Sequence, residues 1–275
     1  MNSPKEVAQN YIETGIAKSK LPVGKALVLG VLAGMFIALA AAGATIASST
    51  VASASLAKLI SAVVFPGGLA MVVVAGSELF TGNCLIVIPV MQREAGVTGM
   101  LKNWLFVYTG NFIGSILVAA LVVYGGTLAL FSNAAAASAI HTAAGKVSLH
   151  FVDALFRGIL CNFLVCIAVW MAFAAKDVVG KIIGVFFPVM LFVVSGFEHS
   201  IANMYYIATG LFASRNPTLL GAAQSAFPND AFTNLTWGRF FAANLLPVTL
   251  GNIIGGVSVW AMMRAGHLRK PVNKQ

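Results

Sequence analysis

Charged side chains are scarce in this sequence: Asp, Glu, Lys and Arg make up 9% of its 275 residues, and only eight are acidic. A soluble globular protein carries about 25% charged residues, so this chain has too few to coat a surface that faces water. Together with the 59% of hydrophobic residues, this excludes a soluble domain and a disordered chain. The net charge of +9 does not indicate nucleic-acid binding, because the basic residues form no stripe. The composition predicts an integral membrane protein.

Cysteine and histidine are also rare. The three cysteines, Cys84, Cys161 and Cys166, lie in apolar segments without metal-ligand spacing, which excludes a disulfide scaffold and favours packing as small hydrophobic residues. Only one of four histidines, His199, lies inside a long apolar run. A membrane-embedded haem or metal oxidoreductase would need paired histidine ligands, so we expect no enzyme and no cofactor.

Six apolar stretches are long enough to cross a membrane, which takes about 20 residues per helix. They cover residues 24–47, 56–90, 101–130, 151–175, 181–211 and 239–263. The second and fifth are too long or too interrupted for one plain helix. No segment shows the period-two alternation of a membrane barrel. We predict an all-α integral membrane protein with six transmembrane helices, the second and fifth of them broken.

The basic residues predict the orientation. With the N-terminus inside, 12 of the 17 fall on the cytoplasmic side and four on the other, so both termini are expected in the cytoplasm. The expected single membrane domain, 1–275, divides into a cytoplasmic interfacial helix (1–23), a first repeat (24–130), an outer loop (131–150), a second repeat (151–263) and a cytoplasmic tail (264–275).

A helix start precedes the first apolar run. Ser3 is the expected N-cap, Pro4 the first helical residue and Glu6 the reciprocal cap partner. The apolar face that follows, which includes Tyr11, predicts a helix at the membrane surface. It could serve as an anchor or as a gate.

Two motifs each occur twice. Residues 75–83 align with 195–203 as G-x-E-x-x-x-small-N, and residues 103–111 align with 244–252 as N-x-L-x-V-x-x-G-N. The first and fourth apolar runs show no comparable match. Because each half would hold three spans, the halves must enter the membrane from opposite sides, and such inverted repeats place a transport site near the midplane.

The first motif combines buried charge with helix breaks. Glu78 and Glu198 lie inside apolar runs, where a carboxylate is costly and usually functional. The residues that can adopt positive φ there are Gly76, Gly82, Gly196 and Asn203. Each break exposes backbone N–H groups at the start of a half-helix, and these attract anions.

His199 follows Glu198 and has Leu79 as its repeat equivalent. Histidine can donate a hydrogen bond or pass a proton near neutral pH, although a buried histidine can also be purely structural. Thr81 offers a hydroxyl to a passing ion. Leu79, Phe80 and Phe192 form apolar constrictions or ordinary core packing.

Three further polar residues are candidates. Lys146, in the predicted outer loop, would concentrate anions, or it is a solvated loop residue. Asn162 and Asn252 would satisfy broken backbone or His199, or they hold helices together.

Four segments resemble the formate/nitrite transporter family: 76–82, 162–166, 195–204 and 247–252. The resemblance implies an aquaporin-like protomer in a homopentamer with one pore per protomer, in a bacterial or archaeal inner membrane. Its partners would be a small anion and the lipid bilayer, with no nucleic acid. Arg157 departs from what formate-type members imply and leaves the subtype open.

The resemblance also implies residue roles. His199 would be the central pore histidine, supported by Glu198 and Asn162, and Thr81 would face the pore. The constrictions would be lined by Leu79, Phe80 and Phe192, and Lys146 would be the vestibule lysine.

We therefore predict a channel or transporter for formate, nitrite or hydrosulfide, in which His199 assists by hydrogen bonding or by lending a proton. The alternative is an uncharged-solute pore of aquaporin type, although the paired Asn-Pro-Ala boxes of that family are absent.

Overall fold

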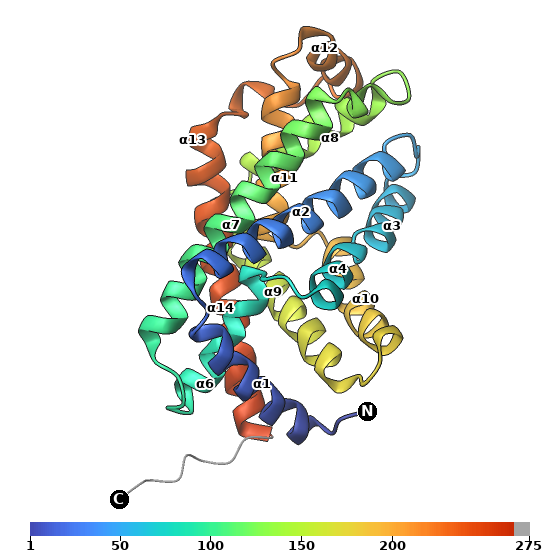
Figure 1. The fold of residues 1–275 in the computed structure, drawn as a ribbon. Coiled ribbons are helices and arrows are strands. Elements are labelled where there is room, and N and C mark those ends of the chain that lie inside the picture. The colour runs from blue at the N-terminus through green and yellow to red at the C-terminus, as the bar shows by residue number, and fades with distance from the viewer. Residues whose placement is uncertain (267–275) are drawn as a thin grey trace, which may run out of the picture.

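The computed structural model describes residues 1–266, apart from the side chains of residues 264 and 265. The tail predicted at 264–275 therefore lies almost entirely outside the described residues. Every regular element in the described part of the chain is helical (Figure 1). Helix α1 and the end of α14 lie at one end of the molecule, and α8 and α12 lie at the opposite end (Figure 1).

The N-terminal half contains nine helical elements. They are α1 (Pro4–Ser19), α2 (Val23–Ser48), α3 (Ala54–Val64), α4 (Gly67–Ala75), α5 (Phe80–Asn83), the 3₁₀ turn η1 (Cys84–Ile86), α6 (Val87–Met91), α7 (Val97–Tyr124) and the 3₁₀ turn η2 (Thr127–Ala129).

The C-terminal half contains nine more within residues 1–266. They are α8 (Ala134–Val147), α9 (Phe151–Ala174), α10 (Val178–Val194), α11 (Ser200–Ala213), α12 (Pro217–Ala226), the 3₁₀ turn η3 (Phe232–Asn234), α13 (Trp237–Arg239), the π-helical stretch η4 (Phe240–Leu245) and α14 (Leu246–Gly266).

Five segments in the described part of the chain are long and apolar enough to cross a membrane. They are Val23–Ser48, Ala54–Ala75, Val97–Tyr124, Phe151–Ala174 and Trp237–Met263. Four of them coincide with the first, third, fourth and sixth predicted runs. The fifth run, 181–211, consists of α10 and α11, which have 17 and 14 residues and are each shorter than a plain crossing of about 20.

Glycine lets the long helices of each half approach closely. Helix α2 packs on α7, and α9 packs on α14 in the same way. A Cβ on Gly30 would lie 3.2 Å from Gly110 Cα, and a Cβ on Gly158 would lie 3.2 Å from Gly251 Cα. Small residues at such crossings allow backbone-to-backbone packing.

Gly30 and Gly158 also correct an expectation. The first and fourth apolar runs are equivalent, because both glycines make the same close approach to their partner helix. The sequence match between the two runs is weak, because it rests on a few small and apolar residues, beginning with Ala26-Leu27 and Ala154-Leu155, rather than on a polar motif.

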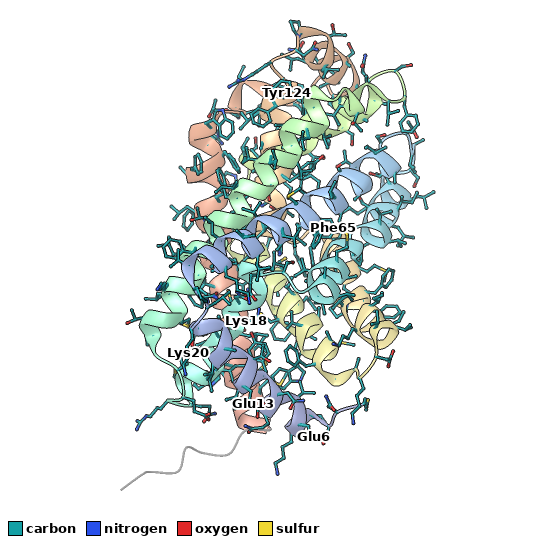
Figure 2. The ribbon with its side chains drawn as sticks, in the orientation of Figure 1. Glu6, Glu13, Lys18, Lys20, Phe65 and Tyr124 are labelled. Atoms are coloured by element: carbon teal, nitrogen blue, oxygen red, sulfur yellow. The ribbon has the colours of Figure 1, made fainter. Side chains whose placement is uncertain are left out.

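Helix α1 begins as predicted. Ser3 caps it, and the Glu6 carboxylate accepts a hydrogen bond from the Ser3 N–H at 2.6 Å, which completes the capping box. The apolar face of α1 packs against the bundle: Tyr11 is buried and its hydroxyl donates to the Gly82 carbonyl (3.3 Å). Burial raises the pKa of Tyr11 well above its usual value, so it stays a neutral donor. Figure 2 places Lys18 on this helix, near the bundle.

The segment predicted as an outer loop, 131–150, holds a helix. Residues Ala134–Val147 form α8, whose run of alanines has high helix propensity. Its buried side packs against α11 and α12.

Two of the four expected positive-φ positions have that conformation. Gly76 (φ 75°) ends α4, and Gly196 (φ 71°) follows α10. Gly82 and Asn203 were expected to break helices as well, but they lie inside α5 and α11. The Gly82 carbonyl accepts a hydrogen bond from Tyr11, and the Asn203 amide donates to Glu198 and Asn244.

Candidate functional site

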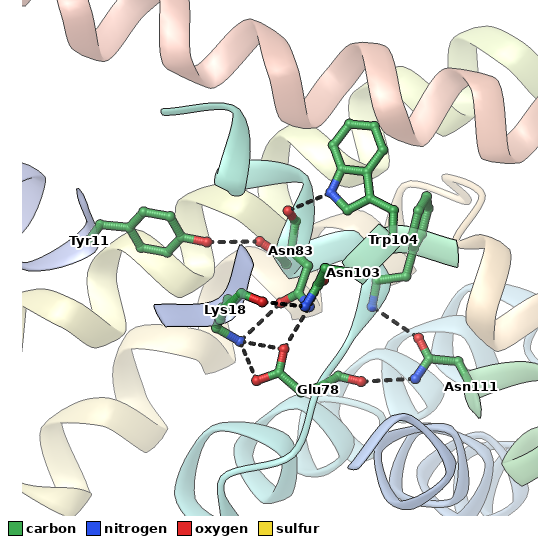
Figure 3. A network of polar contacts seen from close by, with 9 residues as sticks. Tyr11, Lys18, Glu78, Asn83, Asn103, Trp104 and Asn111 are labelled. Carbon is green, nitrogen blue, oxygen red and sulfur yellow. Dashed lines mark hydrogen bonds and ion pairs between the residues drawn. The ribbon is translucent and has the colours of Figure 1, made fainter. Parts of the chain in front are cut away.

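A closed polar network surrounds the end of α4 (Figure 3). The Lys18 ammonium donates to both carboxylate oxygens of Glu78 (2.8 and 2.9 Å) and to Asn83 Oδ1 (3.0 Å). Asn83 Nδ2 donates to Glu78 (2.6 Å) and to Asn103 Oδ1 (2.8 Å), and Asn103 Nδ2 donates to the Lys18 carbonyl (3.0 Å). The buried carboxylate is thus neutralised and fully hydrogen-bonded, as a charge in an apolar setting requires.

The second half of the chain repeats this network. Lys146 donates to both oxygens of Glu198 (2.9 Å each). Asn203 Nδ2 donates to Glu198 (2.6 Å) and to Asn244 Oδ1 (2.8 Å), and Asn244 Nδ2 donates to the Lys146 carbonyl (2.9 Å). One contact differs, because Asn203 Oδ1 has no partner and Lys146 instead lies 5.4 Å from the centre of the Tyr206 ring.

Two asparagines hold the chain between the helix ends. Asn111 Oδ1 accepts from the Phe80 N–H (2.9 Å), and its amide donates to the carbonyls of Gly30 (2.7 Å) and Glu78 (2.9 Å). Asn252 accepts from the Ser200 N–H in the same way. These amides satisfy the first backbone N–H of α5 and of α11, which would otherwise be unpaired.

His199 and Thr81 join the two halves. His199 Nε2 lies 2.9 Å from Thr81 Oγ1, and both side chains are buried. His199 Nδ1 accepts a hydrogen bond from the Ala202 N–H (3.1 Å), so in the neutral ring the proton sits on Nε2 and points at Thr81. The histidine predicted as the centre of the site therefore meets the predicted threonine across 118 residues of sequence.

The three apolar candidates lie in different surroundings. The Phe192 ring stacks on His199, with centroids 5.9 Å apart, and it contacts Phe65 edge-on. Leu79 precedes α5 and is buried. The ring of Phe80 packs against α7, with its centroid 4.9 Å from that of Tyr108.

Two cavities approach this centre from opposite ends. The α8-side cavity, about 450 Å³, is lined by His199, Phe192 and Lys146, among others. The α1-side cavity, about 270 Å³, is lined by Leu79, Lys18 and other residues. They share no lining residue, and Phe80 and Thr81 line neither. The His199–Thr81 pair connects a wall of the first cavity to the short helix whose Gly82 lines the second.

Repeat-related positions line the two cavities. Offset by 120 residues, the α1-side residues Val72, Val73, Ser77, Leu79, Gly82 and Asn83 correspond to Phe192, Val193, Phe197, His199, Ala202 and Asn203 on the α8 side. At the position where one half has leucine, the other has a histidine. The two cavities are therefore lined by equivalent positions of the two halves.

The hydrogen bonds of Asn162 within residues 1–266 are made with residues other than His199. Its amide donates to the Asn252 carbonyl (2.7 Å), and the Cys166 thiol lies 3.9 Å from its Oδ1. It therefore helps to join α9 to α14. No group of three or more His, Cys, Asp and Glu within residues 1–266 is placed to hold a metal ion.

The repeat motifs did not reveal Lys18 as a site residue. Its offset of 128 residues from Lys146 equals that between Gly30 and Gly158, so aligning the first and fourth runs would have found it. Asn83, Asn103 and their equivalents were visible as motif residues, but their partners were not.

Membrane-length apolar helices, two equivalent halves and a cavity on either side of the His199–Thr81 pair are features expected of a membrane transport protein. The family model described as "Formate/nitrite transporter" matches residues 5–266. The chain belongs to the formate/nitrite transporter family and is a membrane transport protein, not an enzyme.

Individual similar proteins are described as formate transporters or formate channels. The chain is 39% identical to a probable formate transporter of Methanothermobacter thermautotrophicus, over 92% of both chains. It is 38% identical to the formate channel FocA of Escherichia coli K12, over 92% of this chain and 90% of that one. A solved structure described as a pentameric formate channel with formate bound matches with a TM-score of 0.78 and 31% identity, over 87% of this chain and 95% of that one.

Proposed function

We propose that the chain conducts small monovalent weak-acid anions, namely formate, nitrite or hydrosulfide, along the path between the two cavities. The observation that carries this proposal is the His199–Thr81 pair where the two halves meet. A bare anion is costly in an apolar passage, and hydrogen-bond donors there lower that cost.

His199 acts as a neutral donor in this proposal. Its Nδ1 already accepts from the Ala202 N–H. A second proton on the ring would sit on Nδ1, where it would face the Ala202 N–H, and two donors cannot hydrogen-bond each other. The imidazolium form would therefore lose this bond. Of the two roles expected for His199, this geometry supports hydrogen bonding over lending a proton.

Thr81 stands between the histidine donor and the anion in this proposal. Because Nε2–H donates to Thr81 Oγ1, the hydroxyl proton of Thr81 is left to point at an anion. Leu79 and Phe192, one on each side, strip water from the anion. Phe80 stays a predicted constriction residue. It directly precedes Thr81 and would act by fixing where Thr81 lies.

The networks around Glu78 and Glu198 hold the two interrupted crossings in place. In this proposal the second crossing runs through α3, α4, α5 and α6, and the fifth runs through α10 and α11. Together with the four plain spans they make six, arranged as an inverted repeat. Asn252 and Asn162 position the second half, and Lys146 neutralises Glu198.

The assembly and location follow from the relatives and the sequence. We propose a homopentamer with one path per protomer, as the matched solved structure is a pentameric channel. The basic residues favour both termini in the cytoplasm, which places α1 and its cavity inside and α8 outside an inner membrane.

Flux assays in proteoliposomes test the function. The purified protein should pass formate, nitrite or hydrosulfide faster than empty liposomes do. Water permeability without anion flux would instead favour the uncharged-solute pore.

Paired variants then test the two donors. Thr81→Val keeps the shape but removes the hydroxyl, and His199→Phe removes the ring nitrogens. Because a hydrogen bond to a charged group contributes about 1.5–3 kcal/mol, Thr81→Val should slow anion flux about tenfold to a hundredfold. His199→Phe should also slow it, because the Thr81 hydroxyl then loses the donor that orients it. Thr81→Ser, which retains the hydroxyl, is the matched control. Unchanged flux, selectivity and proton coupling in a correctly assembled His199→Phe protein would reject the central role of the histidine.

A further inference from the structure

The α8-side cavity holds basic groups and no acidic ones. Lys58, Lys146 and His141 are among its described lining residues, whereas no Asp or Glu is. Which of these groups carries an uncompensated positive charge decides how the cavity attracts an anion, because an unpaired charge acts over a distance and a neutral pair does not.

Two of the three are compensated. Lys146 is bound by both carboxylate oxygens of Glu198 at 2.9 Å. The His141 ring contacts the Asp230 carboxylate. Neither pair adds net positive charge to the cavity, so Lys146 is not the free cation that its position in the sequence indicated.

Lys58 has no carboxylate paired with it in the described part of the chain. Within residues 1–266 it takes part in none of the ion pairs and donates no hydrogen bond.

Helix α3 directs Lys58 toward the cavity. Its residues Ala54, Ala57, Lys58 and Ser61 line the cavity, as does Phe65 at its C-terminal end. Lys58 lies three residues before Ser61 and four after Ala54, so these residues share one face of the helix. On the other face, leucines such as Leu56 and Leu59 are exposed.

Hydroxyl groups continue from Lys58 toward the centre. Thr45, Ser48 and Ser61 line the same cavity, and the hydroxyl oxygens of Ser48 and Ser61 lie 3.5 Å apart. Phe192 and His199 also line this cavity. The cavity therefore runs from a free ammonium, past hydroxyls, to the central histidine.

We propose that Lys58 is the anion-concentrating residue of the α8-side entrance and draws small monovalent anions into the cavity before they reach Phe192. This rests on the proposed function. Within residues 1–266, the equivalent position of the other half carries no lysine, because the 120-residue offset aligns Lys58 with Val178, and nearby Lys181 lines a cavity together with Glu13.

Charge exchange at one position tests the proposal. Lys58→Cys is modified in detergent, before reconstitution, with a trimethylammonium-ethyl, a methyl or a sulfonato-ethyl methanethiosulfonate. These reagents give a positive, a neutral or a negative side chain of related chemistry. The native thiols of Cys84, Cys161 and Cys166 are fully buried, so treated wild-type protein controls for reaction elsewhere.

Formate flux should follow the charge. At about 0.01 M ionic strength, where the Debye length is about 30 Å, the positive adduct should conduct about tenfold faster than the negative one, with the neutral adduct between them. At about 1 M salt the Debye length is about 3 Å, and the differences should shrink below about twofold.

Lys102→Cys is the matched control, because Lys102 is an exposed lysine of α7 that lines neither the α8-side nor the α1-side cavity. Its three adducts should conduct equally. If the three Lys58→Cys adducts give equal flux at low salt while the wild-type protein conducts, the role proposed for Lys58 is wrong. The proposed function is not affected by that outcome. A wild-type protein that conducts no anion at any salt concentration would overturn the proposed function and this inference with it.

Discussion

The ion pair between Lys18 and Glu78 should be among the most strongly coupled pairs in the protein. Lys18→Met leaves the Glu78 carboxylate without its counter-charge while Asn83 alone still donates to it. Breaking a buried pair on one side costs about 3–5 kcal/mol. The two side chains are 22% and 10% exposed, so we expect the lower end, about 3 kcal/mol, because water screens part of the charge.

The double variant Lys18→Met/Glu78→Gln separates the pair from its members. A glutamine at position 78 can still accept from Asn83, and no unpaired charge remains. Its loss of stability should be smaller than the sum of the two single losses by about 2 kcal/mol.

Unfolding in detergent micelles, followed by far-UV circular dichroism as denaturant is raised, measures these differences. If unfolding is irreversible, unfolding rates replace equilibrium values. Lys20→Met removes an equal charge from an exposed neighbour and should change stability by less than about 0.5 kcal/mol. A double variant no more stable than additivity predicts, or a Lys20→Met variant as unstable as Lys18→Met, would refute the reasoning.

Two further predictions concern packing and capping. Gly255→Ala should destabilise the protein by about 1–3 kcal/mol or more in the same unfolding assay, because the new methyl group would collide with the Ile159 carbonyl. Gly24→Ala is the control and should cost no stability, because a Cβ there would have no atom within 4 Å. Equal losses of stability in the two variants would contradict the prediction. The hydrogen bond from the Ser3 N–H lowers the pKa of Glu6 below its usual 4.5, so its stabilising effect on α1 is present above pH 4.5 and is lost as pH falls through the lowered value. Hydrogen exchange of α1 should therefore be faster in Glu6→Gln than in wild type at pH 7 and alike well below pH 4.5; a difference that persists at low pH would show that the carboxylate is not responsible.

Features that depend on neighbours in the sequence were predictable. The capping box of α1 involves residues three apart, and the positive φ of Gly76 and Gly196 follows from the absence of a Cβ. The membrane-length helices follow from composition alone. The repeated motif also indicated that Glu78 and Glu198 have equivalent surroundings.

Features that depend on partners far apart in the sequence were not predictable. The sequence shows His199 and Thr81 as separate candidates, but only folding places them in contact and leaves the ring proton on Nε2. Lys18 reaches Glu78 because α1 docks on the bundle, which the apolar face of α1 did not distinguish from lying on a membrane.

The roles of the lysines show the same division. A helical membrane protein of two related halves can be predicted from the order of the residues, because apolar length and repeated polar motifs are properties of the chain read in order. The pairing of Lys146 with Glu198, and the lack of such a partner for Lys58 within residues 1–266, become visible in the folded protein. Charge compensation depends on distances of a few ångströms between residues far apart in sequence, and these distances exist only once the helices are packed.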